Sequence, residues 1–334
     1  DLSPAIKLRE IGKYKEAQDW LNKFIESDSS HPEALSLLSQ VLLLDQKEAQ
    51  AESALLAAAS LNSELLSVYR NQARLLLKQS KPTEALKKAQ LVCEKSPDDP
   101  ENLLVLASCF GANQKDSEAL PIIERLLNSK PNYAEAYANR ALIRLRANNI
   151  EGAIKDAKKA TLLKPHLAQI WSLLGSLYYQ NNNLVDAIEA LRSAHRNEPE
   201  NVFFMIQLGE FLRQDGKAEE AIPILEQATE LAPKDADAWT SLGMAFQQEK
   251  EISKATHAYE KVLVLDPQSA GVHCNLGAIE MESRRWDSAL VYYRRALDLD
   301  PSLFEAHFNL GTVLSKKGEL DDAEVSLRKA HALR

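Results

Sequence analysis

The chain is poor in the residues that stabilise small secreted folds and that build metal centres. It has three cysteines in 334 residues, an odd number whose spacing matches no metal-binding motif. No stretch approaches the roughly 18 consecutive apolar residues of a membrane span, and no cleavable signal pattern precedes the first helical segment. These absences argue against a disulfide scaffold, a structural metal and membrane insertion, and they favour the cytoplasm.

Catalytic motifs are also missing from the sequence. No glycine-rich phosphate loop follows a strand, because no strand is evident, and no serine or cysteine lies in a recognisable nucleophile motif. His273 and His307 lie 34 residues apart, but they lack a close third ligand, so we interpret them as packing residues. The sequence therefore predicts no enzyme, no cofactor and no metal ion.

The net charge of −8 is unevenly distributed along the chain. Residues 1–167 carry +1 and residues 168–334 carry −9, counting Lys and Arg against Asp and Glu. Nucleic-acid-binding proteins usually present a continuous basic surface, which an acidic chain with a few local basic residues does not provide. We therefore expect no nucleic-acid partner.

A strict repeat dominates the chain. Alanine recurs every 34 residues without an insertion, at Ala17, Ala51, Ala85, Ala119, Ala153, Ala187, Ala221, Ala255, Ala289 and Ala323. These ten residues are called the ladder alanines below. A fixed period between about 20 and 50 residues indicates a stacked repeat array, and such arrays commonly serve as binding surfaces.

Each repeat predicts two short helices joined by a tight turn. Residues 168–180 and residues 185–197 each carry one apolar stripe at helical spacing. A small residue stands twelve positions before each ladder alanine from Ser39 onward, where the two helices must approach closely. A turn-forming residue stands five positions before half of the ladder alanines, at Gly12, Asn148, Asn182, Gly216 and Gly318. Pro121 and Pro223 fall inside predicted second helices.

This pattern resembles the tetratricopeptide repeat family over essentially the whole chain. The resemblance implies an all-α, right-handed superhelical solenoid of about ten 34-residue helix-turn-helix repeats, whose first helices line a concave groove. It predicts one array over residues 1–334, with repeats at about 1–31, 32–65, 66–99, 100–133, 134–167, 168–201, 202–235, 236–269, 270–303 and 304–334.

The resemblance also implies a function. We expect a non-catalytic protein–protein interaction scaffold that binds an extended peptide or a partner protein in its groove. The alternative is a substrate-recruiting arm of a larger enzyme, such as a glycosyltransferase, whose catalytic domain lies outside this sequence.

Three groups of residues are candidates for the groove wall. Arg70, Arg74 and Lys78 follow an i, i+4, i+8 spacing that spans roughly 12 Å. In the family frame this row lies on the groove side, and Arg146 has the offset of Lys78 two repeats later. Such a row could pair with the carboxylates of an acidic peptide or with a phosphate. The alternative is a solvated charged face without a ligand.

The second group is asparagine fourteen positions before the ladder alanine, at Asn71, Asn139, Asn275 and Asn309. A primary amide donates and accepts hydrogen bonds, so it can pair with the backbone of an extended ligand. The alternative is that the family tolerates asparagine at this position without any ligand.

The third group is apolar and comprises Tyr179, Phe203, Ile206, Met244 and Met281. The family frame turns these side chains toward the groove, where exposed apolar groups mark contact sites. The alternative is that they pack in the core, with Phe204 rather than Phe203 facing outward.

The last predicted helix, residues 320–334, carries Leu327, Ala330 and Leu333 on the side where a following repeat would pack. Exposed apolar surface is unfavourable in water. We expect further chain, a partner or a second copy to cover it, and we prefer an end-to-end homodimer.

Overall fold

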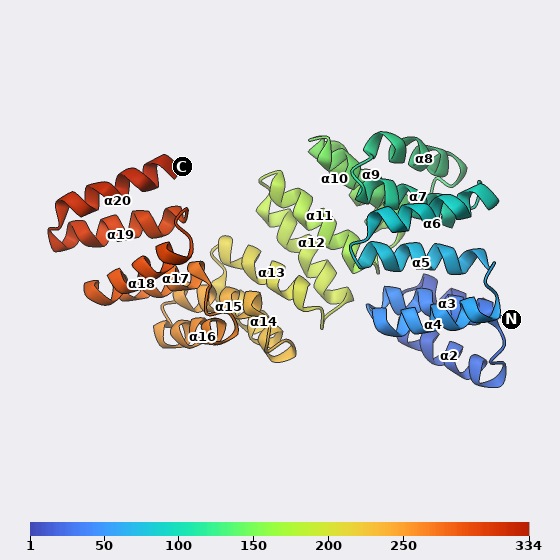
Figure 1. Ribbon diagram of the computed structural model, residues 1–334, viewed down its shortest axis with the longest axis horizontal. Helices are drawn as coiled ribbons and strands as arrows, with labels where there is room; N and C mark the ends of the chain where they lie inside the picture. The colour runs from blue at the N-terminus through green and yellow to red at the C-terminus, as the bar shows by residue number, and fades with distance from the viewer. Residues whose placement is uncertain (334) are drawn as a thin grey trace. The chain divides into compact units, whose positions relative to one another are not determined.

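The computed structural model describes residues 1–333, so Arg334, the last residue of the predicted array, lies outside the described residues. Residues 1–333 form twenty α-helices and no strand, which confirms the predicted all-α class (Figure 1). None of these helices has the length and apolar character needed to cross a membrane. The helices divide into two compact units, an N-terminal unit of residues 1–183 and a C-terminal unit that begins at Leu184. This division falls inside the predicted repeat 168–201, and the single array stays a prediction.

The N-terminal unit contains the first eleven helices of the described chain, which are α1 (Ser3–Glu10), α2 (Tyr14–Ser27), α3 (Pro32–Leu44), α4 (Glu48–Leu61), α5 (Leu66–Lys78), α6 (Pro82–Lys95), α7 (Pro100–Ala112), α8 (Asp116–Ser129), α9 (Ala134–Arg146), α10 (Ile150–Leu163) and α11 (Ala168–Gln180). The C-terminal unit contains α12 (Leu184–Asn197), α13 (Val202–Gln214), α14 (Ala218–Leu231), α15 (Ala236–Gln248), α16 (Ile252–Leu265), α17 (Ala270–Glu282), α18 (Trp286–Leu299), α19 (Phe304–Lys317) and α20 (Leu320–Leu333). Pro121 and Pro223 lie inside α8 and α14, as predicted.

The ladder alanines are buried in both units. Nine of them are fully buried and Ala323 is 3% exposed. The small residue twelve positions earlier makes room for the side chain four positions after the ladder alanine. A Cβ on Gly243 would lie 2.6 Å from Cε1 of Tyr259, and a Cβ on Gly277 would lie 2.7 Å from Cε1 of Tyr293. The predicted close approach of the two helices is therefore confirmed at these glycines.

The turn inside each repeat places one residue in the left-handed region. The five predicted turn residues all have positive φ, between 57° and 85°. The same position in the other five repeats also has positive φ, although the residues there are Gln46, Ser80, Gln114, Lys250 and Arg284. The helix pair therefore imposes this conformation whatever the side chain.

The proline that follows a second helix accepts a hydrogen bond from the next first helix. Trp171 Nε1 donates to the carbonyl of Pro165 at 2.9 Å, and Trp239 Nε1 donates to that of Pro233 at 3.1 Å. Tyr137 donates in the same way, and the rings of His273 and His307 contact the equivalent carbonyls. These contacts agree with the interpretation of the two histidines as packing residues.

The three cysteines are free thiols. Cys109 and Cys274 are buried, and Cys93 is half-buried. Burial disfavours the thiolate, and it raises the pKa of Cys93 and Cys274 to about 11 and that of Cys109 to about 12.

Candidate functional site

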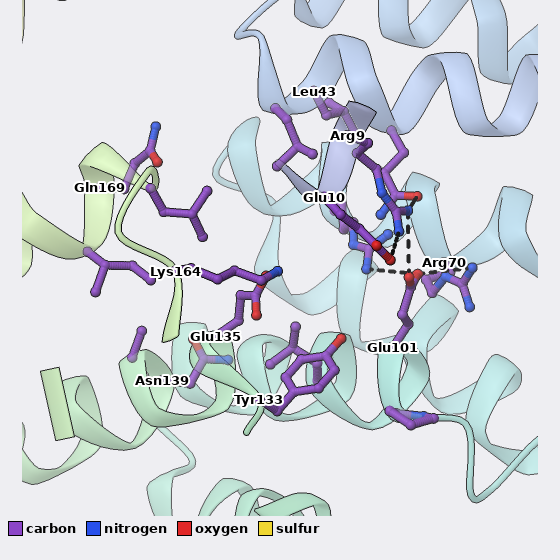
Figure 2. Close-up of a pocket in the computed structure, with 18 of the residues that line it drawn as sticks. Arg9, Glu10, Leu43, Arg70, Glu101, Tyr133, Glu135, Asn139, Lys164 and Gln169 are labelled. Atoms are coloured by element: carbon purple, nitrogen blue, oxygen red, sulfur yellow. Dashed lines mark hydrogen bonds and ion pairs between the residues drawn. The ribbon is translucent and has the colours of Figure 1, made fainter. Parts of the chain in front are cut away.

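The N-terminal unit contains a cavity of about 970 Å³ that is partly open to solvent, called the N-terminal cavity below. Its lining comes from α1, α2, α3, α5, α7, α9 and α11, together with Gln46, Asp99 and residues of the loops before α9 and α11. Figure 2 shows Arg9 and Leu43 on one side of this space and Tyr133 and Asn139 on the other. The lining includes six basic side chains and four carboxylates, so the cavity carries an excess of positive charge.

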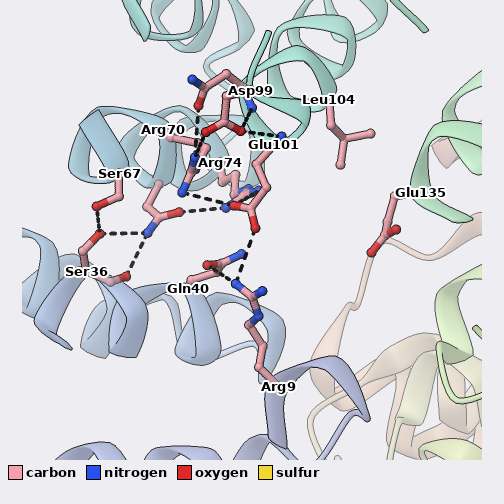
Figure 3. Close-up of polar contacts among 12 residues, drawn as sticks. Arg9, Ser36, Gln40, Ser67, Arg70, Arg74, Asp99, Glu101, Leu104 and Glu135 are labelled. Atoms are coloured by element: carbon pink, nitrogen blue, oxygen red, sulfur yellow. Dashed lines mark hydrogen bonds and ion pairs between the residues drawn. The ribbon is translucent and has the colours of Figure 1, made fainter. Parts of the chain in front are cut away.

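Glu101 is the centre of a polar cluster on one wall of this cavity (Figure 3). Its Oε2 lies 3.1 Å from a guanidinium nitrogen of Arg70 and 3.4 Å from one of Arg74. Its Oε1 lies 3.6 Å from a guanidinium nitrogen of Arg9. Three arginines from α1 and α5 therefore share one carboxylate from the first turn of α7. Glu101, Arg9, Arg70 and Arg74 are called the arginine cluster below.

Neighbouring side chains hold these arginines in place. Arg9 Nη1 donates to Oε1 of Gln40 at 2.6 Å. Arg70 Nη1 donates to Oδ1 of Asn102 at 3.1 Å and contacts Asp99 at 3.4 Å. Because these contacts join neighbouring repeats, the cluster also fixes the wall of the cavity.

Burial and charge compete at Glu101. Burial by itself would raise the pKa of this carboxyl group, but the charges of Arg74, Arg70 and Arg9 outweigh it and hold the pKa below its ordinary value. For Arg74, burial is the largest influence and lowers the pKa of the guanidinium from its ordinary value.

The opposite wall carries Lys164, whose Nζ lies 2.5 Å from Oε1 of Glu135. Asn139, one of the predicted amides, also lines the cavity on this side. Its Nδ2 donates to Oγ of Ser108 at 2.7 Å. Near the first helix, a Cβ on Gly12 would lie only 2.7 Å from Cδ2 of His166. The turn between α1 and α2 therefore contacts the loop before α11, and this contact closes the lining between its first and last helices.

The predicted basic row reaches the cavity, but two of its members are engaged. Arg70, Arg74 and Lys78 all line the N-terminal cavity. Arg70 and Arg74 pair with Glu101, whereas Lys78 makes no ion pair within residues 1–333 and is exposed. Arg146 lies outside the lining, and its Nε and Nη2 donate to the two oxygens of Asp116 at 2.8 and 2.5 Å.

Asn71 is 1% exposed, and its amide is used inside the protein. Its Nδ2 donates to the carbonyl oxygen of Ser36 at 2.8 Å, and its Oδ1 accepts from Arg74 at 2.9 Å. The Asn71 amide therefore supports Arg74 from behind the cavity wall.

Tyr179 is 41% exposed at the C-terminal end of α11 and does not line the cavity.

The C-terminal unit has a smaller cavity of about 480 Å³. Met244 and Asn275 line it together with Arg213 and Glu282. Met281 and Ile206 are partly buried against their core clusters, and Asn309 is half-buried on α19.

Phe203 is 60% exposed and Phe204 is 3% exposed. Their rings meet edge to face with centroids 5.8 Å apart. Phe203 is therefore the outward residue of this pair, and the register with Phe204 outward is wrong.

The last helix exposes only part of the predicted stripe. Leu327 is 37% exposed and Leu333 is 44% exposed, whereas Ala330 is 2% exposed. Ala330 is therefore buried within the unit and does not belong to the exposed face. The end-to-end homodimer stays a prediction.

Sequence reasoning missed several residues of the N-terminal cavity, including Glu101 and Arg9. The repeat register contained a signal for some of them, because Glu101, Glu135 and Gln169 lie 34 residues apart and all line the cavity. Within residues 1–333, no group of three or more His, Cys, Asp or Glu side chains is arranged to hold a metal ion.

Two family models match different parts of the chain. Residues 166–334 match the cilia and flagella-associated protein 70 C-terminal domain, a TPR model. Residues 6–158 match the ChAPs, the Chs5p-Arf1p-binding proteins. Among curated proteins, no sequence matches this chain.

Solved structures share the fold at low sequence identity. A chain of the APC/C hetero-tetramer Cut9-Hcn1 is 19% identical with a TM-score of 0.68, covers 91% of this chain and is itself covered over 59% of its length. YrrB, a TPR protein with an unusual peptide-binding site, is 24% identical over 55% of this chain and 95% of its own, with a TM-score of 0.48.

MamA from Desulfovibrio magneticus RS-1 is 22% identical over 51% of this chain and 96% of its own, with a TM-score of 0.48.

The family model of the cilia and flagella-associated protein 70 C-terminal domain matches just over half of the sequence, and the helices of this chain form pairs as in a TPR array. The chain therefore belongs to the tetratricopeptide repeat family, and its residues 166–334 belong to the family of the cilia and flagella-associated protein 70 C-terminal domain.

Proposed function

We propose that the chain is a non-catalytic protein-interaction module whose N-terminal cavity binds an extended, acidic segment of a partner protein. The observation that carries this proposal is the excess of basic side chains on the concave lining of residues 1–183. Ligand-binding cavities commonly measure about 300–1,000 Å³, and this one lies near the upper end at about 970 Å³. The families that match the chain support an interaction role.

Two lysines are the best candidates for direct contact with the segment. Lys78 and Lys130 line the cavity, are exposed, and make no ion pair within residues 1–333. Their ammonium groups can therefore pair with partner carboxylates without breaking a contact inside the protein. Asn139 also lines the cavity, on the wall opposite the arginine cluster, where its amide can contact the backbone of the segment.

The C-terminal unit offers a surface of different chemistry. Phe203 is largely exposed, and Met244 and Asn275 line the smaller cavity of this acidic unit. We propose that this surface contacts a partner through apolar and amide groups rather than through basic charge.

The proposal can be tested with a fluorescein-labelled decaglutamate peptide as the probe. Binding to the purified chain is followed by fluorescence anisotropy at increasing chloride concentration. Exposed ion pairs contribute about 0.2–1 kcal/mol each, so the double variant Lys78→Gln, Lys130→Gln should bind roughly 2- to 30-fold more weakly than the wild type. Affinity should also fall as salt rises, because exposed charges are screened.

A matched control is the double variant Lys155→Gln, Lys159→Gln. These lysines are exposed on α10 and outside the cavity lining, and their loss changes the net charge equally. The control should bind as the wild type does. An equal loss of affinity in both double variants, or binding that ignores salt, would refute a cavity-specific site.

A further inference from the structure

The arginine cluster has more donors than its carboxylate can satisfy. The three contacts to Glu101 are 3.1, 3.4 and 3.6 Å long, and only that from Arg74 to Glu101 also meets hydrogen-bond geometry. Close guanidinium–carboxylate pairs place their atoms about 2.7–2.9 Å apart and often use two parallel bonds. Two carboxylate oxygens cannot form such paired bonds with three guanidinium groups at once.

One donor in the cluster is buried without a partner. Arg70 Nε has no hydrogen-bond acceptor within the described residues. A buried donor that is left unsatisfied is unfavourable, and a water molecule, an ion or a ligand that accepts from it would remove this cost. The cluster therefore holds a carboxylate but does not fit it closely.

Charge around the cluster favours an anion in place of Glu101. Arg9, Arg70 and Arg74 supply three positive charges, whereas Asp99 beside Arg70 and Glu10, which lies 4.0 Å from Arg9, supply two negative charges. Without Glu101 the net charge is +1, and the Glu10 side chain is 59% exposed, so solvent screens its charge. A phosphoryl group on a serine or threonine carries a charge near −2 at neutral pH and has three acceptor oxygens, one for each arginine.

Glu101 can leave this position without unfolding α7. The helix is capped by Asp99, whose Oδ1 accepts from the backbone N–H of Glu101 at 2.8 Å and of Asn102 at 3.3 Å. The Glu101 side chain takes no part in that cap. It lines the N-terminal cavity and is 27% exposed, so it has space to rotate.

We infer that the arginine cluster is a binding site for a phosphorylated residue of a partner segment, and that Glu101 occupies this site as an internal stand-in for the phosphoryl group. This inference rests on the proposed function of the N-terminal cavity and names the chemistry of its partner. Phosphorylation of the partner then provides a charge that displaces Glu101.

The test uses three small probes, N-acetyl-phosphoserine amide, N-acetyl-glutamate amide and inorganic phosphate. Each is titrated into the wild-type chain by calorimetry at low salt and about pH 7.5, where the phosphoryl group is largely dianionic. The phosphoserine probe should bind at least about tenfold more tightly than the glutamate probe, because it satisfies more charged donors. Glu101→Gln should strengthen phosphoserine binding by about fivefold or more, because the competing charge is gone.

Glu135→Gln is the matched control. Glu135 lines the same cavity and pairs with Lys164 rather than with the cluster, so its loss changes the cavity charge equally. This variant should stay within about twofold of the wild type, since its carboxylate is outside the cluster. Arg74→Gln should abolish the preference for the phosphoserine probe.

Several results would overturn the inference. These are an equal gain in Glu135→Gln, no gain in Glu101→Gln, or tight binding of inorganic phosphate without binding of phosphoserine. If Glu101→Gln does not fold, the melting temperature of the wild type decides instead. It should rise with the phosphoserine probe at constant ionic strength, and the same titration of Arg74→Gln should show no rise. Decaglutamate binding is measured separately, so the failure of either proposal can be recognised.

Discussion

Gly243→Ala tests how tightly the two helices of one repeat are packed. The new Cβ would lie 2.6 Å from Cε1 and 2.8 Å from Cδ1 of Tyr259. That ring is fully buried, and its hydroxyl donates to Oε1 of Gln247 at 3.0 Å, so it cannot move aside easily. Overpacking of this kind destabilises by about 1–3 kcal/mol.

A gain in helix propensity offsets part of that loss. Replacing a glycine inside a helix by alanine stabilises by about 0.8–1 kcal/mol. We therefore expect Gly243→Ala to lower the free energy of unfolding by roughly 0–2 kcal/mol. Urea unfolding followed by circular dichroism, together with amide hydrogen exchange in α15 and α16, measures the change.

Gly271→Ala is the control, because a Cβ at that position in α17 has nothing within 4 Å. It should be neutral or stabilise by up to about 1 kcal/mol. A double-mutant cycle isolates the contact. In a Tyr259→Ala background, Gly243→Ala should no longer destabilise, since alanine faces alanine at the equivalent positions Ala73 and Ala89. If Gly243→Ala destabilises equally in both backgrounds, the ring contact is not the cause.

Lys250 has a φ of +60°, which glycine adopts without strain, so Lys250→Gly should raise the free energy of unfolding in urea by about 1 kcal/mol. Glu249 has a φ of −80°, so the control Glu249→Gly should lower it. Trp239→Phe removes the hydrogen bond to the Pro233 carbonyl and should lower the free energy of unfolding by about 0.5–1.5 kcal/mol in the same assay. At Glu101 the pKa is lower in the folded chain than in the unfolded one, so its stabilising effect is complete above the unfolded pKa and is lost as pH falls through the folded pKa. Calorimetry should therefore show Glu101→Gln melting below the wild type at neutral pH, and this difference should shrink below about pH 4. A difference that stays constant with pH would show that the Glu101 charge does not stabilise the fold.

The position of a residue within the 34-residue repeat predicts the backbone conformation of the turns more fully than its residue type does. Gly and Asn identify five of the ten turns, but Lys250 and Arg284 do not look like residues that adopt positive φ. The left-handed conformation disfavours such residues by about 1–2 kcal/mol. The apolar surface buried between the paired helices outweighs that penalty. The position five residues before the ladder alanine therefore adopts positive φ whatever residue stands there.

The arginine cluster could be predicted only in part. The i, i+4, i+8 spacing puts Arg70, Arg74 and Lys78 on one face of α5, and all three side chains line the cavity. It gives no information about Glu101, which comes from the following first helix, because helical spacing describes contacts within one helix. The contact between Arg9 and Glu101 joins residues 92 positions apart, so it depends on the curvature of the N-terminal unit. No local pattern encodes that curvature.

Equivalent positions of the repeat carry the chemistry that distinguishes one part of the chain from another. The position eighteen before the ladder alanine is Glu101, Glu135 and Gln169 in three successive repeats, and Phe203 in the next. The first three line a basic cavity, and Phe203 is 60% exposed in the C-terminal unit. Because the buried positions keep the backbone nearly constant, substitutions at these four positions change the surface chemistry without altering the fold. Under the proposed function these positions select the partner, whereas the buried ladder reports only the repeat family.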